Sequence, residues 1–386
     1  MKRNVFLVTL AALSGLMLAA CDDAEYGIKD NSVYIAEAAS TEKAAIVSME
    51  TNGADVNVTV RLAQAVDYKT QVSVVIEPAL LTRYNEANSA EYLLVPDEYL
   101  QFDANAKVTI PAGEISAVFK IHVDNFDTQG KRYALPVALG KIVEGNVAKS
   151  ASQSKFIYLI SKPLIVSVPL MSGVNSGAVR APAADSIPSW NLHVPQWSLE
   201  AWVRMDGYSK NNQAIFDNGE GSSEVYIRFG DANAPYNYLQ VKTLGGQVQT
   251  ERDLVANTWY HWTFVYDGSN FIIYRNGEQD VMFSPPPAPA DGVIFNRISM
   301  IGSGATYFPN KCNMSQVRFW KTALTQAQIK NNMFFSIDPN NANLIAYWPM
   351  DEGAGNLFHD ISGNERHAVA SSGILREWQH NVRFDK

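Results

Sequence analysis

The sequence of 386 residues predicts an all-β protein with two domains. Two observations support this prediction. Apolar and polar residues alternate along many short segments that are separated by turn residues, which is the pattern of antiparallel strands with one buried face. The aromatic composition also changes along the chain, because all eight Trp lie between Trp190 and Trp378. Such a change indicates two different hydrophobic cores, and the chain is long enough for two or three domains.

Residues 1–20 have the pattern of a signal peptide. Two cationic residues precede an apolar run over residues 5–20, which is too short to form a spanning helix. The run ends in Leu18-Ala19-Ala20-Cys21, which resembles the lipobox of bacterial lipoproteins. The resemblance implies that Cys21 is lipidated and that residues 21–30 form a tether, so that the membrane is reached through the lipid anchor only. An ordinary secretory signal with a chance Cys is the alternative.

Three acidic residues, Asp22, Asp23 and Glu25, follow this cysteine closely. An acidic cluster here resembles the surface-export signal of Bacteroidetes lipoproteins. In enterobacterial lipoproteins an Asp at this place suggests retention at the inner membrane instead. The domains that follow favour the first interpretation, which predicts an outer-membrane lipoprotein exposed on the cell surface.

The charge and the cysteine content exclude several classes of function. The formal net charge is −8 at pH 7, so binding to nucleic acid by bulk electrostatics is not expected. The second of the two cysteines, Cys312, has no partner once Cys21 is lipidated. We therefore expect no intrachain disulfide, and we expect Cys312 to be a buried structural thiol.

Residues 31–162 are predicted to form a β-sandwich. Apolar residues occupy every second position of Val-Asn-Val-Thr-Val-Arg-Leu at residues 56–62, and Pro111-Ala112-Gly113 marks a turn. Residues 79–90 are expected to form a short helix or a loop. The other segments with strand-like alternation are 72–76, 108–110 and 119–123.

Four stretches of this region, taken in order, resemble a known family. They are Tyr84 to Asn88, Tyr92 to Pro96, Val108 to Gly113 and Lys131 to Pro136. The family is the N-terminal domain of unknown function that begins many Bacteroidetes surface lipoproteins. Such proteins often belong to glycan-utilisation gene clusters, sometimes with family 18 glycosidase domains. The family has no catalytic role, so the resemblance implies a spacer between the membrane and the next domain.

Residues 163–386 are predicted to form a second all-β domain. In the segment from Trp197 to Arg204 both faces are apolar near the middle, as in the centre of a sheet. Asn276-Gly277 is a strong hairpin signal, and residues 324–330 are expected to form a short helix capped by Thr325. Further strands are expected at 224–229, 238–243, 259–267, 271–275 and 314–320.

Several of these segments together resemble a laminin-G-like, concanavalin-type domain. The resemblance implies a concanavalin-like two-sheet jelly roll, in a family whose members bind carbohydrates or proteins, often with a structural calcium ion. The matching stretches are Ser198 to Val203, Trp259 to Gly268, Ile273 to Gly277, Gln316 to Leu324, Leu344 to Gly353 and Asp360 to Asn364.

Two of these residues are candidate calcium ligands. Asp360 and Asn364 match the metal-associated loop of the family, and calcium prefers oxygen ligands of this kind. The alternative is an Asx turn, in which these side chains bond only their own backbone.

A sugar site needs an aromatic platform for the apolar face of the ring and planar polar groups for its hydroxyls. Two loops combine these features, one at residues 233–238 and one at residues 306–310. The alternative for each aromatic residue is packing in the core. The candidate ligand-binding residues are Arg228, Tyr236, Tyr238, Gln240, Tyr307 and Trp378, with Trp190 as a further possibility.

No enzymatic pattern stands out. The Glu-x-Asp-x-x-Glu pattern of retaining glucanases, zinc-type His spacing, a Gly-x-Ser-x-Gly elbow and phosphate-binding loops are all missing. The sequence thus predicts a non-catalytic glycan-binding lipoprotein that works beside an outer-membrane glycan importer. A protein-binding or adhesion module on the same fold, and a glycoside hydrolase with an unrecognised site, are the alternatives.

Overall fold

A computed structural model describes most of the chain. The predicted signal peptide, the lipidation at Cys21 and the candidate Tyr307 lie outside the described residues. No helix in the described part of the chain is long and apolar enough to cross a membrane. The described ranges are 31–39, 44–88, 90–172, 178–182, 190–219, 224–303 and 308–384.

The first domain is built almost entirely from short strands. Its strands are β1 (Ser32–Ile35), β2 (Ala44–Ser48), β3 (Ala54–Leu62), β4 (Thr70–Ile76), β5 (Leu93–Leu94), β6 (Leu100–Gln101), β7 (Lys107–Ile110), β8 (Ser116–Val123), β9 (Tyr133–Glu144), β10 (Ala148–Lys149) and β11 (Lys155–Ser161). Its helical elements are η1 (Ala36–Ala39), α2 (Pro78–Asn88) and η2 (Asp97–Tyr99).

These strands form two packed sheets. One sheet has the order β10-β1-β3-β8-β6, and the other has the order β2-β11-β9-β4-β7, with β5 paired to β9. The alternation in β3 explains the packing, since Val56, Val58 and Val60 are fully buried in the core between the sheets. The predicted β-sandwich is confirmed for this region, and the segment left open as helix or loop is the helix α2.

The second domain also consists mainly of strands. They are β12 (Ile165–Met171), β13 (Val179–Ala181), β14 (Leu192–Val194), β15 (Trp197–Met205), β16 (Gln213–Asp217), β17 (Val225–Phe229), β18 (Leu239–Thr243), β19 (Gly246–Gln249), β20 (Trp259–Tyr266), β21 (Phe271–Arg275), β22 (Glu278–Phe283), β23 (Val293–Phe295), β24 (Ile298–Met300), β25 (Gly302–Ser303), β26 (Cys312–Trp320), β27 (Leu344–Trp348), β28 (Leu357–Phe358), β29 (Ala368–Ala370) and β30 (Leu375–Arg383), with one helix, α3 (Gln326–Asn332), among the described residues.

Two large sheets of this domain face each other across a core of large aromatic and aliphatic side chains. The first sheet has the order β22-β21-β20-β15-β26-β12-β30, with β27 paired to β26. The second has the order β19-β18-β17-β16-β24-β13-β29-β28, with β25 paired to β16. Trp197, Trp262 and Phe264 of the first sheet are fully buried against Ile227 and Phe229 of the second. The all-β fold class predicted from the sequence is therefore confirmed in both domains.

Local signals account for several connections. Asn276 and Gly277 have φ angles of +53° and +76°, as a two-residue hairpin turn requires, and they join β21 to β22. Thr325 caps α3 in a capping box with Gln328, because each side chain bonds the backbone N–H of the other residue. The predicted cap is thus confirmed.

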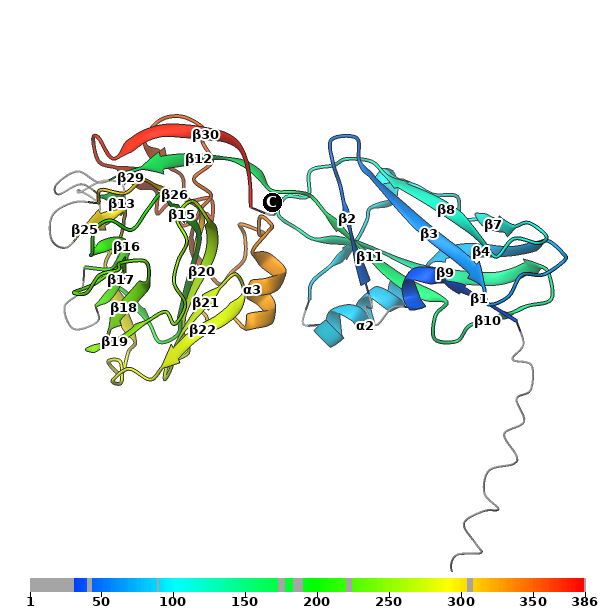
Figure 1. Cartoon of the computed structure of the whole chain (residues 1–386), viewed down its shortest axis with the longest axis horizontal. Coiled ribbons are helices and arrows are strands. Elements are labelled where there is room, and N and C mark those ends of the chain that lie inside the picture. Colours follow the sequence, from blue (N-terminus) through cyan, green and yellow to red (C-terminus); the bar gives the residue numbers. More distant parts are fainter. Residues whose placement is uncertain are drawn as a thin grey trace, which may run out of the picture.

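The outer faces of the two large sheets differ. On the first sheet, α3 and the segment that follows it bury the outer face, where Trp320 and Tyr347 pack with Ile329 and Ile337. We call this sheet the covered sheet. On the other sheet, no described helix lies over the outer face in Figure 1, and the loop that carries Asp231 packs against part of it. We call it the open sheet. Figure 1 shows that α3 lies on the side of the second domain that faces the first domain, whereas the open sheet lies on the far side.

Candidate functional site

The outer face of the open sheet brings together two of the predicted ligand-binding residues. In β17, Val225, Ile227 and Phe229 point into the core, so the residues between them point outward. β17 pairs with β18 in a register that sets Arg228 opposite Gln240. These two residues are twelve positions apart in sequence, and the hairpin makes them neighbours on one face.

Arg228 and Gln240 are joined by Asp231 into a compact polar group. The Arg228 guanidinium donates to Gln240 Oε1 at 2.5 Å and lies 2.8 Å from Asp231 Oδ1. The Gln240 amide donates from Nε2 to Asp231 Oδ2 at 3.0 Å. We call Arg228, Asp231 and Gln240 the polar triad. Because each member holds the other two in place, its donors and acceptors have fixed directions, as recognition of hydroxyl groups needs.

Tyr226 adds an aromatic ring to the same face. The Arg228 guanidinium carbon lies 4.9 Å from the centre of the Tyr226 ring, which itself is partly exposed. The sequence analysis missed this residue, although the alternation in residues 224–229 already put Tyr226 and Arg228 on one face. The reason is that a tyrosine within a strand is usually a core residue, whereas a tyrosine in a loop is more often exposed.

The predicted loop tyrosines have a bracing role. Tyr238 accepts a hydrogen bond from the Asp231 backbone N–H at 2.9 Å, and its hydroxyl lies 3.5 Å from the Asn233 carbonyl. Tyr236 packs on Gly230, where an added Cβ would lie 2.6 Å from the Tyr236 Cβ. Both rings are partly buried. They therefore hold the loop that carries Asp231 next to β17 and β18.

The two predicted Trp candidates lie apart from the polar triad. Trp378 is in β30 of the covered sheet, where its indole N–H donates to the Gly355 carbonyl at 3.2 Å and its ring packs near Phe358. Trp190 stacks on Trp348, with ring centres 6.3 Å apart. Each ring is partly buried against the core. The structure therefore favours the packing alternative for both residues.

The candidate calcium loop is held by its own hydrogen bonds. Asp360 is 5% exposed, and its carboxylate accepts backbone N–H groups from Tyr347, Ser362 and Arg366, each at 2.9 Å. The Asn364 amide donates to the carbonyls of Leu344 and Ile345, both at 3.2 Å.

This arrangement does not fit a calcium site. A carboxylate that already accepts three N–H groups offers few lone pairs to a cation. Within the described ranges, no group of three or more His, Cys, Asp or Glu residues could hold a metal ion. Only the bond from Ser362 to Asp360 is an Asx turn, and the bonds to Tyr347, Leu344 and Ile345 tie the loop to β27. The contacts therefore favour a structural role for Asp360 and Asn364, and bound calcium stays an untested prediction.

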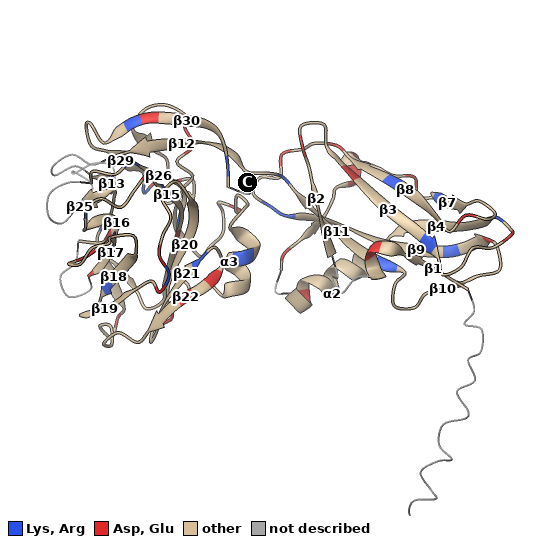
Figure 2. Ribbon diagram, in the orientation of Figure 1, with Lys and Arg blue, Asp and Glu red and all other residues tan. Residues whose placement is uncertain are grey.

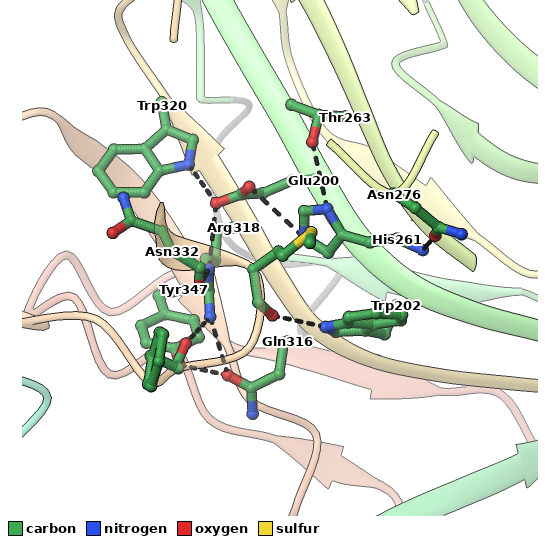
Figure 3. A network of polar contacts seen from close by, with 12 residues as sticks. Glu200, Trp202, His261, Thr263, Asn276, Gln316, Arg318, Trp320, Asn332 and Tyr347 are labelled. Carbon is green, nitrogen blue, oxygen red and sulfur yellow. Dashed lines mark hydrogen bonds and ion pairs between the residues drawn. The ribbon is translucent and has the colours of Figure 1, made fainter. Parts of the chain in front are cut away.

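A second polar cluster is buried beneath α3 and residues 333–337, which we call the covering segment of the covered sheet (Figure 3). Glu200 and Arg318 have no exposed surface, and the Arg318 Nη1 atom lies 3.3 Å from Glu200 Oε1. The Trp320 indole donates to the same oxygen at 3.1 Å, and His261 Nε2 lies 3.6 Å from the other oxygen. Burial raises the pKa of Glu200, although the Arg318 charge and the Trp320 hydrogen bond oppose that shift.

This buried cluster organises the fold around it. Arg318 donates to the carbonyls of Asn332 at 3.3 Å and of Phe335, while the Trp202 indole donates to the Met333 carbonyl at 2.7 Å. These bonds fix the segment after α3 onto the sheet. Because solvent does not reach Glu200, we infer a structural role for this carboxylate. The buried thiol predicted at Cys312 is confirmed, and burial raises its pKa.

These features define a class of protein: a two-domain all-β chain whose second domain is a jelly roll with one covered and one open sheet. Residues 175–330 match the laminin-G-type family model of the concanavalin A-like lectin/glucanases superfamily. Residues 29–144 match the family model of an N-terminal domain. Each model matches a part of the chain, and the two matches confirm both resemblances found in the sequence and the concanavalin-like jelly roll.

A solved structure shares this two-domain architecture. A presumed carbohydrate-binding protein from Bacteroides ovatus aligns over 90% of this chain and 97% of its own, with 20% identity and a TM-score of 0.56. At this identity the likeness concerns the fold.

Two further structures align over parts of the chain. EndoBT-3987 of Bacteroides thetaiotaomicron, solved with a Man5GlcNAc product, aligns over 34% of this chain and 30% of its own, with 22% identity and a TM-score of 0.28. The SAP-like pentraxin of Limulus polyphemus aligns over 57% and 95%, with 13% identity and a TM-score of 0.37. No curated protein matches the chain.

Proposed function

We propose that this protein binds a glycan on the outer face of the open sheet, without cleaving it. The observation that most supports this proposal is the polar triad beside the Tyr226 ring. Its carboxylate, amide and guanidinium groups are held rigidly by each other at 2.5 to 3.0 Å. The fold supports the same function, since its superfamily includes lectins and a similar Bacteroides ovatus structure belongs to a presumed carbohydrate-binding protein.

The binding mechanism follows from the groups present. A sugar ring would place its apolar C–H face against Tyr226 and direct its hydroxyl groups toward Asp231, whose side chain is 30% exposed. The Asp231 carboxylate can accept hydrogen bonds from hydroxyls, while Gln240, which is only 4% exposed, holds Asp231 and Arg228 in place. One such site gives weak affinity, because the contact is small and the hydroxyl groups lose their water. Many copies on one surface would gain strength by avidity along a polymer.

The setting of the protein is also part of this proposal. Lipidation at Cys21 would anchor the mature chain in the outer membrane, facing outward because of the acidic cluster that follows. The first domain would act as a spacer. Figure 1 supports this role, because the open sheet lies on the side of the second domain turned away from the first domain. A glycan held there would be passed to an outer-membrane importer.

The proposal is tested by affinity gel electrophoresis of the mature chain, starting at Cys21 without its lipid, through gels that contain single polysaccharides. We expect retardation by at least one polysaccharide and no release of reducing ends when the two are incubated together. Retardation by none, across plant, host and fungal polysaccharides, would contradict glycan binding and favour a protein partner. Release of reducing ends would instead show a hydrolase.

A further inference from the structure

The two domains meet at a narrow cleft. In the first domain, Gly130 lies in the loop that precedes β9, and a Cβ added there would lie 2.3 Å from the carbonyl oxygen of Ile337 in the second domain. A pocket of about 200 Å³ lies at this junction, with lining residues from both domains. It shares Gly130, Lys131, Arg132 and Ser336 with a neighbouring pocket of about 320 Å³.

The smaller pocket is strongly cationic. Lys131, Arg132 and Lys162 line it, and Asp127 is the one acidic residue among its lining side chains. In the part of the chain that the structure describes, none of these three cations forms a salt bridge. Figure 2 shows Lys and Arg segments where the two domains meet. Three cations with a single carboxylate in one pocket are unexpected in a chain with a net charge of −8, although Glu91 and Asp338 line the neighbouring pocket.

One of these cations, Arg132, is partly buried and has one nitrogen without an acceptor. The Arg132 guanidinium lies over the Tyr92 ring, 4.8 Å from its centre, and its Nη1 atom is buried with no acceptor. Lys162 donates to the Phe126 carbonyl at 2.9 Å, which leaves two of its three N–H groups available. An anion in the pocket would accept hydrogen bonds from the available N–H groups and would reduce the repulsion between the three cations, so it would stabilise the pocket.

We propose that this cleft is an anion-binding site for a single oxyanion, either a carboxylate or a sulfate group. An arginine is well suited to a planar or tetrahedral oxyanion, because its N–H groups can bond two oxygens at once. Two lysines add charge without demanding a fixed geometry. The group comes either from a free ion or from an acidic sugar of a larger glycan. Since Phe335 and Ser336 line the same pocket, the bound anion would also join the two domains.

The test measures the melting temperature and the binding isotherm of the mature chain with sodium sulfate, sodium glucuronate and oligogalacturonate, with sodium chloride at equal ionic strength as the reference. We expect sulfate and glucuronate to raise the melting temperature of the wild type above the chloride reference, and by more than they raise that of Arg132→Gln, because the general stabilising effect of sulfate is common to both proteins. We expect Arg132→Gln to weaken binding at least ten-fold. Lys107→Gln removes an exposed lysine of the first domain outside the pocket and is the matched control, which should bind like the wild type.

The outcomes separate the sources and the two sites. Tighter binding of oligogalacturonate than of glucuronate would point to an acidic glycan, and equal binding would point to a free anion. If Arg132→Gln does not fold, Lys131→Gln replaces it, because Lys131 is exposed. Equal shifts in chloride and sulfate, or unchanged binding in both pocket variants, would overturn the proposal. Tyr226→Ala should show the same rise in melting temperature with sulfate as the wild type. A result against glycan binding at Tyr226 would therefore not count against the anion site.

Discussion

The Arg318 guanidinium lies 3.3 Å from the Glu200 carboxylate, and neither side chain has any exposed surface. A buried ion pair contributes little net stability compared with a well-packed apolar pair. Loss of one partner, however, leaves the other charge buried without compensation, which is strongly destabilising. The pair therefore makes a specific prediction about stability. It also links the covered sheet to the segment after α3, through the bonds from Arg318 to Asn332 and Phe335.

We expect Arg318→Met to lower the free energy of unfolding of the second domain by about 3–5 kcal/mol. The loss comes from the uncompensated Glu200 carboxylate and from the freed carbonyls of the covering segment. Urea denaturation followed by tryptophan fluorescence measures it, because all the tryptophans are in the second domain. Arg61→Met, at an exposed arginine in β3, is the control. A loss below about 1 kcal/mol would show that the pair is not structural.

His261 gives a prediction about pH. Burial, with a smaller effect from the Arg318 charge, holds the pKa of His261 well below its ordinary value of 6.5. Below pH 6.5 the unfolded chain binds a proton at His261, whereas the folded protein keeps this side chain neutral. The free energy of unfolding therefore falls as the pH falls below 6.5. When the unfolded state binds one proton more than the folded state, the free energy of unfolding changes by about 1.4 kcal/mol per pH unit. Between pH 6.5 and about pH 5, we expect the wild type to lose about 2 kcal/mol more stability than His261→Gln does.

The comparison with His261→Gln is essential, because the titration of Glu200 changes the free energy of unfolding with pH in the opposite direction. Its raised pKa makes the folded state lose stability as the pH rises from the ordinary value of a glutamate toward the raised one. The difference between wild type and His261→Gln at each pH removes this common contribution. Parallel pH profiles of the two proteins, measured by urea denaturation, would contradict a neutral buried His261.

Gly130 predicts how the two domains are held together. It has a φ of +73°, and an added Cβ would collide with the backbone of Ile337. Gly113 has a similar φ of +81°, but nothing lies within 4 Å of an added Cβ there. Because both positions have a positive φ, alanine at either one costs roughly 1 kcal/mol or more in backbone free energy. Only Gly130→Ala should separate the domains.

Small-angle X-ray scattering and limited proteolysis measure this difference. We expect Gly130→Ala to increase the maximum dimension of the particle and to speed cleavage near Lys162 and Pro163, between β11 and β12. Gly113→Ala should behave like the wild type in both measurements. Identical scattering from all three proteins would mean that the contact between Gly130 and Ile337 does not hold the domains.

The hydrogen bonds of Asp360 lead to a prediction about stability and about metal removal. Asp360→Ala would leave three backbone N–H groups without their acceptor, at about 1–3 kcal/mol for each. We expect a loss of at least about 3 kcal/mol in the free energy of unfolding, whereas EDTA should not change the melting temperature of the wild type. A clear fall in that temperature with EDTA, reversed by calcium, would establish the calcium site that the family resemblance implies.

Period-two patterning and turn chemistry were enough to predict much of the fold. The alternation in residues 56–62 predicts a strand with one buried face, and Asn276-Gly277 predicts a hairpin, because both features depend only on local geometry. The same patterning shows that Glu200 and Trp202 share a face opposite to that of Trp197. It cannot show that distant residues after α3 cover that face, because coverage depends on tertiary packing.

The site was only partly predictable for a similar reason. Arg228 and Gln240 were chosen as candidates from residue type, and the strand register then placed them opposite each other. Tyr226 was missed because a strand tyrosine has the same local pattern whether its face is covered or open. Asp360 has the sequence of a calcium loop and of an Asx turn alike, and the local pattern cannot show that its carboxylate also accepts from Tyr347 of β27.

The central claim is that the Tyr226 face of the open sheet binds a glycan, and the most direct test is isothermal titration of Tyr226→Ala with the polysaccharide that retards the wild type. Tyr34→Ala is the matched control, since Tyr34 is a partly exposed strand tyrosine of the first domain. We predict that Tyr226→Ala binds at least ten-fold more weakly, a loss of about 1.4 kcal/mol, while Tyr34→Ala binds like the wild type. Unchanged affinity in a folded Tyr226→Ala protein would contradict the claim.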